Sequence, residues 1–212
     1  DNGDLELVVC EWGGNVHALN HDGSTLWVRF FQNQLTFGPS PALGDLNGDG
    51  RLEVVIPSKN RNLYAVQWNG SDVPGWPVVY ATQSYTESSP VIADIDGDGL
   101  LDVVLGDEMK FINAWNATGQ LVDGFPLALG DAVRATPVIA DTDGDGDVNI
   151  VATGWDKSVY VWDFPDAFDP QMAPWPRFHA NRFNDGNYDT VVPTPVGGVS
   201  FSFARVARGV EL

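Results

Sequence analysis

Short apolar runs separated by polar turns fill most of the chain, and they recur with a long period. Three stretches align without gaps: D-L-N-G-D-G-R-L-E-V-V-I from Asp45, D-I-D-G-D-G-L-L-D-V-V-L from Asp94 and D-T-D-G-D-G-D-V-N-I-V-A from Asp141. Before these stretches stand S-P-A-L-G, S-P-V-I-A and T-P-V-I-A, and further apolar runs follow each of them. The repeat is therefore roughly 50 residues long, which is typical of repeat architectures.

Each full unit contains four apolar runs that alternate with polar residues or are rich in β-branched residues. Turns rich in Gly, Asn and Asp separate these runs, which is the pattern of a four-stranded antiparallel meander. One meander cannot bury both of its faces, whereas radial stacking of several meanders buries them. The pattern predicts an all-β fold of consecutive four-stranded β-propeller blades. An open β-solenoid is the alternative, for which shorter and more regular repeats are expected.

The repeat also predicts the organisation of the chain. A partial copy opens it, because D-N-G-D-L-E-L-V-V aligns with G-D-G-R-L-E-V-V-I and places Glu6 on Glu53. We therefore expect a fragment of a larger ring, with propeller blades over 1–188 divided into a partial unit 1–44 and units 45–93, 94–140 and 141–188. Residues 189–212 change character and predict a linker followed by the first strand of a C-terminal β-sandwich domain.

The acidic loop at the start of each unit predicts a calcium site. Ca²⁺ takes six to eight oxygens, and carboxylates at positions 1, 3 and 5 of a tight loop can converge on it. Gly at position 6 allows the turn, a main-chain carbonyl at 7 adds an oxygen, and a carboxylate at 9 closes the shell. The three expected ligand sets are Asp45, Asn47, Asp49, the carbonyl of Arg51 and Glu53; Asp94, Asp96, Asp98, the carbonyl of Leu100 and Asp102; and Asp141, Asp143, Asp145, the carbonyl of Asp147 and Asn149. The third set has the weakest closing ligand, since Asn is neutral.

An EF-hand begins in the same way but needs a bidentate Glu at position 12 and an exiting helix. Position 12 is Ile56, Leu105 and Ala152 in the three loops, and the residues that leave each loop read as a strand. Mg²⁺ suits such loops less well because it keeps its waters. The loops are therefore expected to join two strands and to hold three Ca²⁺ ions.

The net charge of −18 makes nucleic acid a poor partner, since a phosphate backbone requires a basic surface. The sequence contains no apolar run long enough to span a membrane. Its single cysteine, Cys10, excludes an intramolecular disulfide, and bound metal ions would take over that stabilising role.

Catalytic motifs are missing from the sequence, which predicts that the chain is not an enzyme. The three histidines, His17, His21 and His179, do not form a convincing zinc site, and His179 is expected to be structural. Lys59, Arg61 and Lys157 fall in turns on one rim of the blades and hint at a binding surface. Trp12 and Trp155 occupy equivalent positions and are expected to pack between blades, with stacking on sugar rings as the alternative.

The units resemble the FG-GAP or VCBS repeats of integrin α-subunit propellers and of many bacterial surface proteins, through the loop D-x-D-G-D-G-x-x-D followed by a strand. The resemblance covers roughly residues 1–180. It implies a propeller that is commonly about seven-bladed, with Ca²⁺ in the hairpin between the first two strands of a blade. The segment from Trp175 to Tyr188 is similar to the closing segment of secreted bacterial propellers, which would finish the last blade or latch onto the first. The tail resembles the start of a surface-sorting domain of Bacteroidetes-like bacteria.

These observations predict a noncatalytic, calcium-stabilised propeller that is secreted or held at a cell surface and binds a protein or glycan ligand. The alternative is the accessory propeller of a secreted protease or polysaccharide-degrading enzyme whose catalytic part is not in this chain. Self-association is expected if the blades do not close a ring alone.

Overall fold

The fold is described by a computed structural model, which covers residues 6–11, 13–31 and 39–188. These residues form β-strands joined by turns, together with one 3₁₀ turn, η1 (Pro170–Met172). The strands are β1 (Leu7–Cys10), β2 (Asn15–Leu19), β3 (Thr25–Phe30), β4 (Ala42–Gly44), β5 (Glu53–Pro57), β6 (Asn62–Val66), β7 (Val78–Val79), β8 (Val91–Ala93), β9 (Asp102–Gly106), β10 (Phe111–Trp115), β11 (Leu127–Ala128), β12 (Val138–Ala140), β13 (Asp147–Thr153) and β14 (Val159–Ala167).

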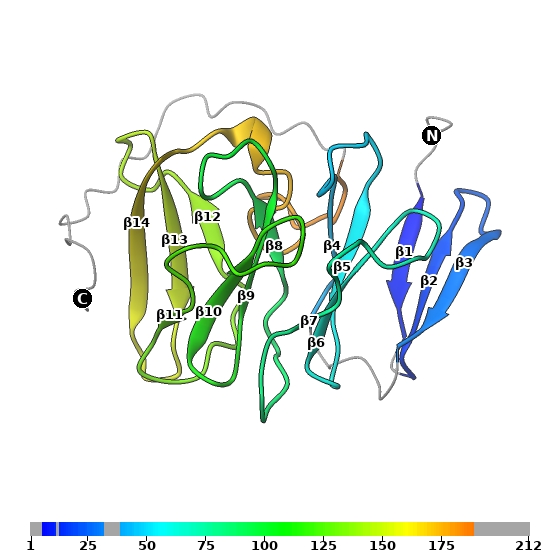
Figure 1. Ribbon diagram of the computed structural model, residues 1–212, viewed down its shortest axis with the longest axis horizontal. Coiled ribbons are helices and arrows are strands. Elements are labelled where there is room, and N and C mark those ends of the chain that lie inside the picture. The colour runs from blue at the N-terminus through cyan, green and yellow to red at the C-terminus, as the bar shows by residue number, and fades with distance from the viewer. Residues whose placement is uncertain (1–5, 12, 32–38, 189–212) are drawn as a thin grey trace.

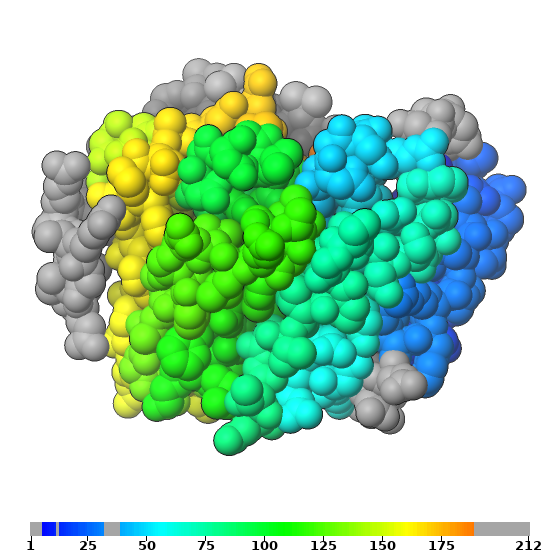
Figure 2. Space-filling model, viewed as in Figure 1, coloured from blue at the N-terminus to red at the C-terminus, as the bar shows by residue number. Residues whose placement is uncertain are grey.

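The strands make four antiparallel sheets, which we call blades one to four (Figure 1). Their orders are β1-β2-β3, β4-β5-β6-β7, β8-β9-β10-β11 and β12-β13-β14. Within each blade, neighbours in sequence are neighbours in the sheet. The blades follow one another in chain order across the molecule and do not close into a ring (Figures 1 and 2). The predicted all-β architecture of consecutive propeller blades is therefore confirmed, and the described blades form an open array.

The blades are offset from the sequence units by one strand. A unit that begins at a loop aspartate, such as 45–93, contains β5, β6 and β7 of one blade and ends with β8 of the next. Each acidic loop therefore joins the first and second strands of a blade, as the pattern predicts. Residues 189–212 lie outside the described residues, and the linker and strand predicted there remain predictions.

Apolar side chains on both faces of each inner blade hold the array together. In β5 and β9 every residue is buried, because alternate side chains point toward the blades on either side. One cluster, around Val16, Phe31 and Val54, joins blades one and two. The second cluster joins blades two and three, and the third joins blades three and four. The core is thus a series of sandwich layers between blades.

Hydroxyl groups connect the residues that precede the first strands. Ser40, Ser89 and Thr136 each stand before a proline at equivalent positions of the repeat. The Ser89 Oγ accepts the Ser40 N–H at 2.8 Å, and the Thr136 Oγ1 accepts the Ser89 N–H at 3.3 Å. Each blade thus offers a side-chain acceptor to the main chain of the preceding blade, and this explains why Ser or Thr stands there.

The segment of residues 170–188, which we call the closing segment, takes a path that the sequence did not predict. Among the described residues, it forms no strand of blade four and no main-chain hydrogen bond to blade one. Trp175 and Ile92 exchange main-chain hydrogen bonds, and Ile139 N–H donates to the Pro176 carbonyl at 2.9 Å. The segment therefore lies beside the first strands β8 and β12, and the Nε2 of His179 reaches the Oγ of Ser40 at 2.9 Å. Figure 1 shows it in orange behind the first strands.

Candidate metal-binding loops

The three acidic loops share one backbone conformation, which the first aspartate organises. Both carboxylate oxygens of Asp45, Asp94 and Asp141 accept main-chain N–H groups from farther along the same loop, at 2.7–3.2 Å. Glycines at the fourth and sixth positions adopt positive φ, for example 71° at Gly48 and 83° at Gly50. Residues with a Cβ rarely adopt this conformation, so the two glycines allow the loop to wrap around a central point.

The ninth position of each loop is a buried polar side chain at the start of the second strand. Glu53, Asp102 and Asn149 are 0%, 1% and 1% exposed. In each case one side-chain oxygen accepts the main-chain N–H of the second loop residue: Leu46 at 2.9 Å, Ile95 at 3.0 Å and Thr142 at 2.7 Å. This bond fixes the end of the loop against the strand.

Burial raises the pKa of both carboxyls at the ninth position. The pKa of Glu53 rises to about 7, chiefly through burial and further through the charges of Asp49 and Asp45. The pKa of Asp102 rises to about 8 for the same reason, with Asp96, Asp98 and Asp94 as the neighbouring charges. Loss of hydration and like charge both disfavour ionisation, and a bound cation would relieve both.

The second and third loops bring carboxylates close enough to share an ion. Asp94, Asp96 and Asp102 form one group, and Asp141, Asp143 and Asp145 form another, with ligand oxygens within 4.8 Å of one another. Oxygens bound to one Ca²⁺ at about 2.3–2.6 Å can be no more than about 5 Å apart. Both groups therefore fit a calcium ion. The ligand roles predicted for Asp98 and for the carbonyls of Leu100 and Asp147 remain predictions.

The first loop has a mixed set of oxygens. The Asn47 Oδ1 accepts the Asp49 N–H at 2.9 Å, and the Asp49 Oδ1 accepts the Arg51 N–H at 2.9 Å. The Asn47 amide donates to the Glu53 Oε1 at 3.2 Å. Asp45, Asn47, Asp49 and Glu53 thus form one hydrogen-bonded loop, in which the carbonyl of Arg51 stays a predicted ligand.

The third loop differs at its ninth position. Glu53 and Asp102 each have a second carboxylate oxygen, whereas the second polar atom of Asn149 is an amide nitrogen, which donates to the Asp163 Oδ1 at 3.2 Å. Asp163 belongs to β14 and forms a further acidic group with Asp145 and Asp147. The sequence did not reveal Asp163 as a neighbour of the loop, because it lies on the third strand of the blade, outside the loop pattern.

Replacing Asn149 by Asp is expected to tighten calcium binding by the third loop. Asn149→Asp supplies the second oxygen that Asp102 already has. Without calcium the same change should lower the melting temperature, because the new carboxylate faces Asp163. Calorimetric titration and melting curves with calcium and with EGTA would check both parts. Asn149→Ala is the matched control and should weaken binding less than Asp96→Ala does. Unchanged affinity in Asn149→Asp would contradict the role assigned to this position.

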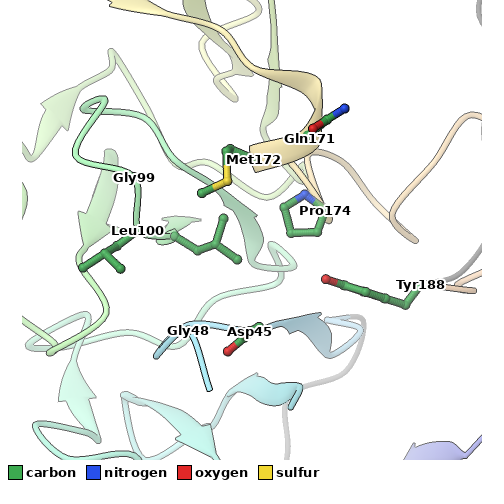
Figure 3. A pocket seen from close by; sticks show the side chains of 9 residues that line it. Asp45, Gly48, Gly99, Leu100, Gln171, Met172, Pro174 and Tyr188 are labelled. Carbon is green, nitrogen blue, oxygen red and sulfur yellow. The ribbon is translucent and has the colours of Figure 1, made fainter. Parts of the chain in front are cut away.

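A cleft separates the first and second loops from the closing segment (Figure 3). Asp45 and Gly48 line one side, and Leu100 with Met172 lines another. Tyr188 also lines the cleft, and its ring extends toward the space between Asp45 and Pro174 in Figure 3. The closing segment thus lies next to the acidic loops.

The opposite rim carries the basic turns. Arg61, Lys110 and Lys157 occupy equivalent turns between the second and third strands, with φ of 71°, 76° and 73°. These turns lie at the far end of β5, β9 and β13 from the acidic loops, which confirms that Lys59, Arg61 and Lys157 share one rim. The expectation that Trp155 packs between blades is wrong. Its side chain is 61% exposed, with the Arg134 guanidinium 3.8 Å from the ring centroid. Trp12 lies outside the described residues.

The described residues thus define an open set of propeller blades, and blades two, three and four each have an acidic glycine-containing loop between their first two strands. No curated protein matches the sequence. Residues 45–105 match the FG-GAP-like repeat family. The matched stretch contains the first and second acidic loops. Together with the described blades, this match places an FG-GAP-like repeat within a β-propeller fold.

Solved structures share the fold at low sequence identity. BamB from Moraxella catarrhalis aligns with a TM-score of 0.56 and 20% identity over 77% of this chain and 44% of its own. The computationally designed Ika4 protein aligns with a TM-score of 0.53 and 18% identity, over 75% of this chain and 85% of its own. The V. cholerae biofilm matrix protein Bap1 aligns with a TM-score of 0.55 and 21% identity, over 76% of this chain and 27% of its own. The chain therefore spans less than half the length of BamB.

Proposed function

We propose that the chain is a noncatalytic, calcium-stabilised propeller scaffold that works outside the cell, secreted or at the cell surface, and binds a protein or glycan ligand. The observation that carries the proposal is the repeated loop, in which main-chain hydrogen bonds hold several carboxylates against one another. Like charges at such distances repel, so the loops favour a state with bound cations.

Calcium suits these loops better than other cations do. The side-chain donors are oxygens from Asp, Glu and Asn, which a hard cation prefers. Magnesium is smaller and gives up its waters reluctantly. Millimolar calcium outside the cell would fill weak sites without regulation, which supports an extracellular location. One protein of similar fold is a biofilm matrix protein.

Three strongly perturbed groups among the described residues support binding rather than catalysis. Glu53 and Asp102 have raised pKa values, and both are bound into the loops. Burial raises the pKa of Cys10 to about 12, so its thiol is a poor nucleophile at neutral pH. No helix among the described residues is long and apolar enough to cross a membrane.

A second candidate is the accessory propeller of a secreted enzyme. The match to Bap1 favours this candidate, because it covers only 27% of Bap1. Blades of this fold therefore occur as one part of a much longer protein. In that case the ligand would be the substrate of the attached enzyme, and the chain itself would again only bind.

The proposal is tested by calcium titration and by ligand screening. Calorimetry should give three calcium sites and much weaker binding of magnesium. The calcium-loaded chain should then bind members of a glycan array or of an extracellular protein panel, and should not turn over polysaccharides or peptides. Reproducible turnover that a point substitution outside the loops abolishes would overturn the noncatalytic assignment.

A further inference from the structure

The two ends of the blade array expose apolar faces that are buried everywhere else in the repeat. At one end, Leu7 and Val9 of β1 are 56% and 40% exposed, and Val28 and Phe30 of β3 are 50% and 62% exposed. The strand register places Val9, His17 and Val28 side by side on this face. The opposite face of the same sheet, with Val16, packs on blade two.

The other end has an equivalent exposed face. The register aligns Val138, Val151 and Val161 across β12, β13 and β14, with Val159 nearby. Val159 and Val161 are 47% and 39% exposed. Ile139, Ile150 and Tyr160 point the other way, into the cluster shared with blade three. Figure 1 shows the two terminal sheets at opposite ends of the molecule.

The inner blades show what covers such faces. Val54 and Ile56 occupy the positions of Leu7 and Val9, and they are 4% and 2% exposed because blade one packs on them. Leu63 and Ala65 occupy the positions of Val159 and Val161, and both are 0% exposed beneath blade three. In every contact between neighbouring blades, the face that corresponds to Val159 and Val161 in one blade packs against the face that corresponds to Leu7 and Val9 in the next blade. The free end faces are therefore complementary to each other.

We propose that two copies of this chain associate head to tail, with the Leu7–Phe30 face of each copy packed on the Val138–Val161 face of the other. Exposed apolar patches of this kind mark association surfaces. The contact is heterologous, and it closes after two copies if they complete a ring. The chain matches 44% of BamB, so two copies supply about the number of blades that one longer chain of this fold contains.

The charges of the chain are compatible with this contact. The net charge is −18, but 11 of the 29 acidic residues lie in the three acidic loops at one rim. The charged or titratable side chains near the two faces include His17 at one end and Asp163, with Asp147 beside it, at the other. Arg29 of β3 pairs with Asp72 on the side of blade two. Calcium in the loops would lower the remaining repulsion between copies.

The test is the mass of the calcium-loaded chain by light scattering and sedimentation over a range of concentrations. We expect about twice the monomer mass of 23.0 kDa. Phe30→Asp disables one face and Val161→Asp the other, and each variant alone should be monomeric. Mixing the two variants should restore association, because one intact pair of faces remains. Val79→Asp is the control, since Val79 is 65% exposed on the outer strand of blade two, and it should leave the dimer intact.

Circular dichroism and melting curves would establish that each variant is folded. A wild-type chain that stays monomeric and binds a hydrophobic dye would overturn the proposal and leave blades of a longer chain as the occupants of both faces. A dimer that only one of the two variants disrupts would show a symmetric contact and would equally overturn it. A measured mass that rises with concentration above that of two copies would also overturn the proposal.

Discussion

Removal of calcium with EGTA is expected to lower the melting temperature of the chain by about 5–10 °C for each loop that loses its ion. A ligand that binds only the folded state adds about 2.7 kcal/mol per site at a hundredfold excess over its Kd. For a chain of this length, 1 kcal/mol corresponds to about 2–4 °C. The buried Glu53 and Asp102 make the effect large, because without the ion their carboxyls lie beside other carboxylates with little water. Scanning calorimetry in millimolar calcium and in EGTA would measure it.

Asp96→Asn provides the matched control for this experiment. It removes one charge from the second loop but leaves the first and third loops unchanged, so the calcium-dependent shift should shrink by about one loop's share. Magnesium at the same concentration should restore little of the stability. Identical melting curves in calcium and in EGTA would refute a stabilising role for the metal.

Trp175→Ala is expected to destabilise the chain by about 3–5 kcal/mol, the usual cost of removing a large buried aromatic side chain. Trp175 is 3% exposed and packs among side chains of blades two and three, including Ile92. Its main chain is also hydrogen-bonded to Ile92. Chemical denaturation followed by tryptophan-independent circular dichroism would give the change in the free energy of unfolding.

Trp68→Ala is the control for this substitution. Trp68 is 51% exposed, and its ring is covered on one side by the Arg51 guanidinium at 4.2 Å. Loss of that contact should cost no more than about 1 kcal/mol. Equal losses of unfolding free energy in the two variants would contradict the conclusion that the buried Trp175 of the closing segment stabilises the contact between blades two and three.

The sequence predicted the blades and loops because their determinants are local. Alternating side chains specify the strands, and Gly48 and Gly50, with their counterparts in the other two loops, specify the turns. The path of the closing segment is not local. P-W-P-R-F resembles G-W-P-V-V-Y, which leads into β7, so the same letters predicted a fourth strand of blade four. Instead β14 runs on to Ala167 and η1 redirects the chain toward β8.

Contacts between blades also escaped prediction. Asp163 lies next to the third loop because of the register between β13 and β14, and a bulge in that register was not visible in the sequence. The Ser or Thr before each proline was visible as part of the repeat. Its bond to the preceding blade depends on how blades stack, and no pattern within one unit encodes that geometry.

The one-strand offset between units and blades has a consequence for proteolytic damage. The acidic loops are exposed and rich in glycine, so they are natural points of cleavage. A nick at Gly97 would leave β8 on one fragment and β9 on the other. These two strands pair within the same sheet, so the fragments would remain joined by its hydrogen bonds. The molecule is therefore expected to keep its fold after a single cut in an acidic loop, because the two strands on either side of the cut stay paired in one sheet.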